Sequence, residues 1–536
     1  MNQQSHIAQH IEKFTSQEIV ENRLRLRTSI EATRWLALQG CSFRGHDESI
    51  ASMNGGNFLE LLSIIASFND EVTKVLDKAP RNASYTSPTL QKQILQVLAT
   101  KVKGAIREEI GHEKFCIIVD EARDESKKEQ MSIVLRFVDR DGFIQERFFG
   151  VVHVKDTSAS TLKECIFSIL SRHNLAVQNI WGQGYDGASN MRGEWNGLKA
   201  LILDECPYAY YVHCFAHRLQ LALEASSKEV IPVHQFFTKL NSIINVVGAS
   251  YGTTHAHRGD ADTAYEVLEI SNMLCQALQL QSQDILNAMH LVSSTKLHIQ
   301  TLRDSGWDEL VASVKSFCET VNITVPNFDA QYIARRGRAR HQQDELTIGH
   351  HYKVDIFNAV IDSQLQELSN RFDDKAIELI ILSSSLDPKE MRVSFRIDDV
   401  CKLVEKFYTR DFEDYEILQL RMQLEHFEHV QQLPDFRILE SISDLCQWLA
   451  KTRKSNIYPL VFRVVTLILT LPVSTATTER SFSAMNIVKT TLLNKMEDEF
   501  LSDCLLVYIE KQIAKQFSID SIIDDFCDIQ ERRSKF

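Results

Sequence analysis

Apolar residues recur along this chain with two different spacings, and the change between them marks its organisation. Residues 90–106 carry an apolar residue every three or four positions, which predicts an amphipathic helix. Ser87-Pro88 stands directly before this stretch, a serine suited to cap a helix followed by a proline suited to its first position. Residues 1–112 as a whole are predicted to be helical.

From about residue 114 the pattern changes to short apolar runs, which are typical of buried strands. Three runs follow one another, and Asp141-Gly142 supplies a turn signal between the second and the third. The runs are FCIIVD (115–120), MSIVLRFVD (131–139) and FIQERFFGVVHV (143–154). Together they predict an antiparallel meander.

Helices and strands alternate after this meander. The pattern predicts a helix over 159–172, a strand near 179–185, a helix around 196–205, a strand at 208–212 and a further helix behind it. Because crossover helices connect parallel strands, the complete sheet is predicted to be mixed.

The remaining chain is predicted to be helical, and its polarity varies. The predicted fold class is α/β, a mixed sheet interrupted by a large all-helical insertion and preceded by an N-terminal helical region. The predicted domains are 1–112, the helical region; 113–225, the first part of the sheet core; 226–450, the helical insertion; and 451–536, which completes the core with dense apolar helices.

Composition restricts the partners and the compartment. The chain has 536 residues and a formal net charge of −13, so a nucleic acid has to meet a local basic patch. Its eleven cysteines form no C-x-x-C pair, which fits free thiols in a reducing compartment. The apolar segment 458–473 is short and contains Arg463, so it is interpreted as a buried helix. We expect an intracellular protein without a membrane partner.

Two aspartates occupy equivalent places in the predicted sheet. Asp120 ends the first strand, and Asp186 follows the fourth strand in the turn GYDGASN. If these strands pair, both carboxylates project from the same end of the sheet, and Glu479, next to a buried helix, is the candidate third member. Carboxylate oxygens are hard ligands that suit Mg²⁺ or Mn²⁺, and two such ions support phosphoryl transfer.

Plainer interpretations of these acids stay open. An aspartate at a strand end is commonly a turn former or a helix cap. Glu479 fits a first-turn acid favoured by the helix dipole. The neighbouring acids Glu121, Asp124 and Glu125 fit solvated side chains equally well.

Four longer stretches resemble the hAT transposase superfamily. They are FCIIVDEARDESKKEQM, IWGQGYDGASNMRGEWNGLK, YYVHCFAHRLQLAL and LPVSTATTERSFSAMNIVKTTLLNKMEDEFL, in this order. More closely, they resemble transposon-derived proteins with an N-terminal TTF-type zinc finger, relatives of the MYM-type zinc-finger proteins.

The resemblance implies a ribonuclease-H-like core split by a helical insertion, with a C-terminal hAT dimerisation region. It also implies that Asp120, Asp186 and Glu479 match an Asp-Asp-Glu triad that binds divalent metal for cutting and joining double-stranded DNA. A nuclear location and a homodimer or higher homo-oligomer follow from the same resemblance.

Two further features concern nucleic acid and the active site. Cys214 and His217, at i and i+3, are predicted on one helical face and match the family's C-x-x-H motif, an accessory element. A buried cysteine and a hydrogen-bonded histidine fit as well. The basic run at Arg335, Arg336, Arg338 and Arg340 is a candidate phosphate contact, or else a solvated charge run.

Several functions remain open from the sequence. No cysteine precedes Cys41, so the zinc finger of the family is missing from this sequence, and residues 246–270 stand where relatives carry a longer insertion. These departures favour a degenerate copy, whereas the triad favours an active DNA transposase or nuclease. The alternatives are a catalytically inactive dimerisation or interaction protein, a nuclear regulator, or an unrelated metal-dependent ribonuclease. The C-terminal apolar helices fit either a dimer surface or the core.

Overall fold

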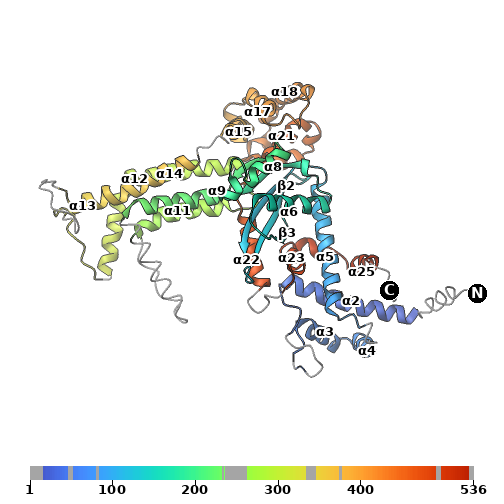
Figure 1. Ribbon diagram of the computed structural model, residues 1–536. Coiled ribbons are helices and arrows are strands. Elements are labelled where there is room, and N and C mark those ends of the chain that lie inside the picture. Colours follow the sequence, from blue (N-terminus) through green and yellow to red (C-terminus); the bar gives the residue numbers. More distant parts are fainter. Residues whose placement is uncertain are drawn as a thin grey trace, which may run out of the picture. The chain divides into compact units, whose positions relative to one another are not determined.

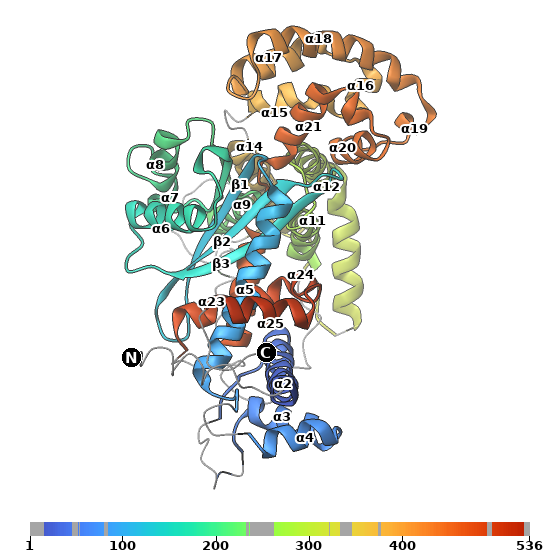
Figure 2. The same cartoon turned by 90° about the vertical axis from the view of Figure 1, so that its right-hand side faces the viewer.

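The structure is a computed structural model that describes residues 16–45, 52, 54–79, 84–231, 235, 262–320, 322–332, 346–372, 377–489 and 496–529. The chain divides into two compact units (Figures 1 and 2). The first unit comprises Met1–Arg140, Ile144–Tyr211 and Thr475–Phe536, and the second comprises Asp141–Phe143 and Val212–Ser474. The four-domain division expected from the sequence stays a prediction.

A five-stranded mixed sheet forms the centre of the fold, in the order β3-β2-β1-β4-β5. The meander is confirmed, since β1 pairs antiparallel with β2 and β2 antiparallel with β3. The predicted mixed sheet is confirmed as well, since β1 pairs parallel with β4, the pairing that the sequence had left as a condition for bringing the two aspartates together. The strands are β1 (Phe115–Arg123), β2 (Glu129–Val138), β3 (Ile144–His153), β4 (Ile180–Tyr185) and β5 (Tyr210–His213).

The helices of the first unit begin and end close to their predicted positions. Ser87 caps α5, where its hydroxyl accepts a hydrogen bond from the Leu90 amide at 3.3 Å. The apolar stripe of α5 is buried, with Ile94, Leu98 and Val102 fully covered. The helices are α2 (Ser16–Gln39), α3 (Asn57–Ser67), α4 (Asp70–Asp77), α5 (Pro88–Ile110), α6 (Ala159–Arg172), α7 (Ser189–Arg192), α8 (Leu198–Glu205), α22 (Ala476–Val488), α23 (Asp498–Ile509), α24 (Lys511–Ala514) and α25 (Ile519–Asp528).

Helices α22 and α5 lie on opposite faces of the sheet. Successive side chains of a strand point to opposite faces. On β3, the Glu146 carboxylate accepts a hydrogen bond from the Thr477 hydroxyl of α22, whereas Arg147 donates to Glu109 of α5. Even-numbered positions of β2, such as Ser132, therefore share the face that α22 covers.

The second unit is helical in the parts that the structure describes, apart from an isolated bridge and the last residues of β5. The segment expected to be a buried helix at 458–473 is α21 (Pro459–Thr470), and Arg463 lies at its surface and bonds Glu416. None of the described helices is both long and apolar enough to cross a membrane. The other longer helices are α9 (Phe215–Glu229), α11 (Asp262–Leu278), α12 (Ile285–Thr320), α14 (Ala359–Arg371), α15 (Ile377–Ser383), α17 (Ile397–Phe407), α18 (Asp414–Glu428) and α20 (Ile442–Lys451).

Helix α23 and the residue after it seal the outer edge of the sheet. The edge strand β3 presents amides that its neighbour β2 leaves unpaired. The Val151 amide donates to the Ser502 hydroxyl at 3.3 Å, and the Phe148 amide donates to the Glu510 carboxylate at 2.7 Å. An open edge invites pairing with other chains, so this cover protects the sheet.

Burial raises the pKa of Glu510 to about 7, and the nearby Glu109 adds to the rise, while the Phe148 amide and Arg147 oppose it. The folded chain thus binds the Glu510 proton more tightly than the unfolded chain does, between the ordinary pKa of 4.5 and about 7. Stability is therefore lost as the pH rises through this window.

We predict that Glu510→Gln removes this loss, because the amide oxygen still accepts from Phe148 while the buried charge is gone. The gain at pH 8 relative to pH 5 should be on the order of 3 kcal/mol, measured by urea unfolding. Glu205→Gln, which changes an exposed carboxylate of the same unit, should leave the pH profile unchanged. An unaltered profile in Glu510→Gln would show that Glu510 is already ionised in the folded chain.

Candidate active site

The parallel pairing of β1 and β4 sets Asp120 and Asp186 at the same end of the sheet. Ile118 lies opposite Gly184 in this pair, so the two aspartates follow at equal distances along their strands. The Asp120 carboxylate accepts a hydrogen bond from the Glu121 amide at 2.9 Å. The Asp186 carboxylate accepts from the Ala188 amide at 3.1 Å and shapes the following turn. Both side chains are half-buried.

Glu479 comes to this region on the first turn of α22. It is exposed, and its carboxylate accepts a hydrogen bond from the Thr475 hydroxyl at 3.4 Å. Asp120 lies opposite Ser132 in the antiparallel register, so the two side chains share a face of the sheet. The Ser132 hydroxyl bonds the Ser481 hydroxyl of α22 at 2.7 Å. Asp120 therefore points to the face that α22 covers.

The charges of these acids act on one another. The pKa of Asp120 is raised to about 7, first by burial and then by the charges of Asp186, Glu479 and Glu121, with the Glu121 amide opposing. A carboxyl that feels two other carboxylates in a half-buried place is typical of a functional site. The structure thus brings the three predicted acids into one electrostatic cluster.

Glu121, for which the sequence had left a solvated position open, is a further acid near Asp120 and Asp186, on the opposite face of β1 from Asp120. Burial, followed by the charges of Asp186 and Glu129, raises its pKa to about 7, and a hydrogen bond from Asn190 of α7 opposes the shift. Its Oε1 atom is buried and has no hydrogen-bond partner among the described residues. A buried oxygen without a donor is costly and suits a cation.

The donor chemistry of this cluster fits Mg²⁺ or Mn²⁺, since carboxylates are hard oxygen ligands. The side chains, however, do not form a preformed metal-binding site. In the part of the chain that the structure describes, no three His, Cys, Asp or Glu side chains come close enough together to coordinate a metal ion. The assignment of Asp120, Asp186 and Glu479 as metal ligands stays a prediction.

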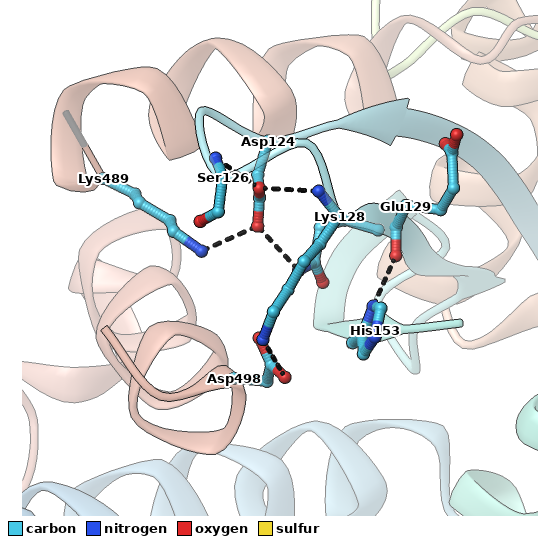
Figure 3. A network of polar contacts seen from close by, with 8 residues as sticks. Asp124, Ser126, Lys128, Glu129, His153, Lys489 and Asp498 are labelled. Carbon is cyan, nitrogen blue, oxygen red and sulfur yellow. Dashed lines mark hydrogen bonds and ion pairs between the residues drawn. The ribbon is translucent and has the colours of Figure 1, made fainter. Parts of the chain in front are cut away.

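A buried ion pair fixes the far end of α22 to the loop that follows β1. Lys489 Nζ donates to Asp124 Oδ2 at 2.7 Å, and both side chains are fully buried (Figure 3). The other Asp124 oxygen accepts from the amides of Ser126 and Lys128 at 2.7 and 3.1 Å. The sequence left open whether Asp124 is solvated. The structure shows a buried carboxylate whose two oxygens both accept hydrogen bonds.

Burial disfavours the Asp124 charge, yet the bonds from Lys489, Gln130 and the Lys128 amide together lower its pKa to about 2. The Asp124 carboxylate therefore stays charged at neutral pH. Because Asp124 lies four residues beyond Asp120 and Lys489 ends the helix that carries Glu479, the pair connects the two segments of the cluster.

A second group of polar contacts connects the beginning of α22 to the sheet. Arg136 of β2 bonds Glu146 of β3 at 2.8 Å, and both side chains are buried. The same carboxylate accepts from Thr477, which also accepts a hydrogen bond from Arg480 at 2.7 Å. Spacing along the sequence gives no sign of these bonds, because their partners are far apart.

The accessory pair Cys214 and His217 lies in the second unit. Cys214 is the N-cap of α9 rather than a residue within the helix, and its sulfur accepts a hydrogen bond from the His217 amide at 3.4 Å. Cys214 therefore caps the helix instead of sharing a helical face with His217, as the sequence had predicted. The basic candidates Arg335, Arg336, Arg338 and Arg340 lie outside the described residues.

Asp120 was expected to end the first strand, but β1 continues to Arg123, while Asp186 directly follows β4. A mixed sheet that carries two carboxylates on adjacent parallel strands, with a covering C-terminal helix, is typical of an RNase-like class of protein. Comparison with protein families agrees. Residues 1–197 match the family described as "ZMYM1/FAM200, RNase-like domain", and residues 419–513 match the "hAT family C-terminal dimerisation region". The first match includes Asp120 and Asp186, and the second includes Glu479. These matches confirm the resemblance to the hAT superfamily and support the ribonuclease-H-like fold.

Two curated relatives share part of the chain. The human "52 kDa repressor of the inhibitor of the protein kinase" is 24% identical over 231 residues, which cover 42% of this chain and 30% of that protein. The mouse protein of the same name is 23% identical over 233 residues, with the same two shares. The match thus spans about a third of the length of these relatives.

We predict that Lys489→Met destabilises the first unit by about 3–5 kcal/mol, because Asp124 is left charged in a buried place. Chemical unfolding followed by tryptophan fluorescence measures the loss. The wild-type pair contributes stability above the ordinary aspartate pKa of 3.8, and this stability is lost as the pH falls toward about 2.

Lys128→Met is the matched control, since the Lys128–Asp498 pair nearby is partly exposed. It should cost about 1 kcal/mol or less. The double variant Asp124→Asn with Lys489→Met should regain part of the stability lost in Lys489→Met. Equal losses in Lys489→Met and Lys128→Met would contradict a special role of the buried pair.

Proposed function

We propose that this protein is a hAT-type, transposon-derived DNA-binding protein whose carboxylate cluster cuts and joins double-stranded DNA. The observation that supports the proposal most is the placement of the acids: Asp120 and Asp186 follow at equal distances along the parallel strands β1 and β4, and Ser481 of α22 bonds Ser132, which lies opposite Asp120. The three residues come from β1, the end of β4 and α22, as the resemblance to the Asp-Asp-Glu triad implies.

Asp120, Asp186 and Glu479 are the residues that would hold Mg²⁺ or Mn²⁺. When bound, such ions stabilise the charge that develops on the attacking and leaving oxygens of a phosphodiester. Asp120, Asp186 and Glu479 would orient the scissile phosphate through these ions. In the reaction, water attacks the phosphorus and one P–O bond to DNA breaks. The DNA hydroxyl released then attacks a second phosphodiester.

The assembly state and the cellular location of the protein are each proposed from a separate argument. The dimerisation-region match over residues 419–513 supports assembly into a homodimer or higher homo-oligomer. Because the proposed substrate is DNA, we expect the protein in the nucleus. A fluorescent fusion tests this location directly.

A second candidate function is a catalytically inactive interaction protein or nuclear regulator. The lack of a ready-made metal cage among the described residues favours it. The curated relatives are named as repressors of the inhibitor of a protein kinase, which supports a regulatory role. Both candidates share the sheet and differ in whether the carboxylates act on DNA.

We predict metal-dependent nicking of labelled double-stranded DNA that includes the sequences flanking the gene. Asp120→Asn and Glu479→Gln should each slow nicking by at least about 100-fold, since charge stabilisation by the ion is worth several kcal/mol. Gel analysis with Mg²⁺, with Mn²⁺ and with EDTA measures the rate.

Asp204→Asn, an exposed aspartate in the same unit, is the control and should nick at the wild-type rate. Equal rates in the wild type, Asp120→Asn and Glu479→Gln would exclude the cluster as the active site. A folded wild type that binds DNA without nicking it would support the regulatory candidate instead.

A further inference from the structure

A cavity lies between α5, α6, β3 and α23 in the first unit, and α23 packs against both α5 and β3 (Figures 1 and 2). Its volume is about 810 Å³, within the range of sites that hold small molecules. Ile133 of β2 belongs to its lining. Because the neighbouring Ser132 faces α22, Ile133 points to the opposite face of the sheet. The cavity, which we call the α6 cavity, is therefore separate from the face that α22 covers.

Three basic side chains converge on the α6 cavity from two helices. Lys103 comes from α5, while Arg172 ends α6 and His173 follows it. Burial lowers the pKa of Lys103, and the charge of Arg172 adds to the shift, while Asp503 and Glu499 oppose it. Burial also lowers the pKa of His173 to about 4, and the charges of Lys103 and Arg172 lower it further. The three groups therefore lie close enough to repel one another.

The position of these groups is only partly explained by the helix that carries two of them. Cations are favoured at a helix C-terminus, which accounts for Arg172 but not for Lys103, brought there by α5. In the described part of the chain, neither side chain forms an ion pair with an acid. Lys101 of the same helix, by contrast, pairs with Asp525 at 2.5 Å. Clustered cations without a paired carboxylate are typical of a place that receives an anion.

The acids that line the α6 cavity restrict where an anion sits and how large it is. Asp503 of α23 is half-buried, and burial raises its pKa to about 6, with Glu499 adding to the rise and Lys103 opposing it. The charges that act on His173 are those of the two cations, so we place the anionic group there. Glu164 and Glu499 are exposed and line the same cavity. They repel a polyanion such as DNA and favour a small ligand.

Apolar side chains supply another part of the lining. Ile169 of α6, Phe500 of α23 and Val152 of β3 are half-buried and line the cavity. Covering such surface with an apolar group is favourable. The ligand that fits therefore combines an apolar body with an anionic group. A phosphate monoester carries up to two negative charges and three acceptor oxygens, enough for three basic side chains.

We propose that the α6 cavity binds a small phosphate monoester with an apolar body, whose phosphate lies between Lys103, Arg172 and His173. The apolar body lies against Ile169 and Phe500. This binding is a function separate from the proposed cutting of DNA, because the cavity opens on the other face of the sheet from α22.

Isothermal titration calorimetry on the full chain, in a buffer without phosphate, tests the site with phenyl phosphate as the probe. The Kd should be roughly 0.1–1 mM, as expected of so small a ligand. Inorganic phosphate lacks the apolar body, and benzyl alcohol lacks the charge. Each should bind at least about tenfold more weakly than phenyl phosphate.

Substitutions in the cavity connect the binding to its side chains. Lys103→Met should raise the Kd for phenyl phosphate at least about tenfold, and Lys103→Arg should keep most of the affinity. Asp503→Asn should lower the Kd roughly twofold or more, because an opposing charge is removed. A loss of folded protein would not produce this gain. Lys101→Met is the matched control on α5, outside the cavity lining, and should bind like the wild type.

The proposal is overturned if the wild type does not bind phenyl phosphate at about 10 mM, or if Lys103→Met keeps the wild-type Kd. Equal affinities for inorganic phosphate and phenyl phosphate would also overturn it, since the apolar body would then add nothing. A 5′-phosphorylated DNA duplex that displaces phenyl phosphate would assign the cavity to DNA ends and exclude a small-molecule ligand. The nicking assay reads Asp120 and Glu479 separately, so the two proposals can fail independently.

Discussion

The candidate site depends on a charge pair that joins two parts of the chain 365 residues apart. Lys489 and Asp124 are both fully buried, and such a pair is stable only when its remaining hydrogen bonds are satisfied. On the Asp124 side they are satisfied by two amides of the loop after β1 and by the side chain of Gln130 of β2. Because either partner alone is costly, α22 has one favourable position along β1. The position of Glu479 relative to Asp120 follows from this constraint.

Around this pair, the face of the sheet under α22 is unusually polar for a protein core. Ser132, Arg136 and Glu146 replace the apolar side chains expected there, and each bonds a partner on α22 or on the next strand. Polar contacts have directions, whereas apolar packing tolerates sliding. A seam of this kind suits a helix that delivers a carboxylate to a fixed place.

Local pattern was enough to predict the five strands, the antiparallel meander and the helices α5, α6 and α8, although β1 continues to Arg123 past its predicted end at Asp120. Apolar runs and β-branched residues marked β1 to β3, and Ser87-Pro88 marked the start of α5. The bonds that position α22 were beyond prediction, since Asp124 reads as a loop acid and Lys489 as a surface lysine until the fold brings them together. Cys214 was expected inside a helix and is its cap, because helix boundaries depend on backbone geometry.

The cover that Ser502 and Glu510 give to the edge of β3 has a consequence for synthesis. The ribosome releases the meander β1 to β3 long before it releases α22 and α23, which follow more than 300 residues later in the chain. During that interval the meander has neither its edge partner nor the helix for its polar face. The nascent chain is thus most exposed to aggregation in its middle stage. A message that ends early would release a sheet with an open edge and a buried aspartate lacking its lysine.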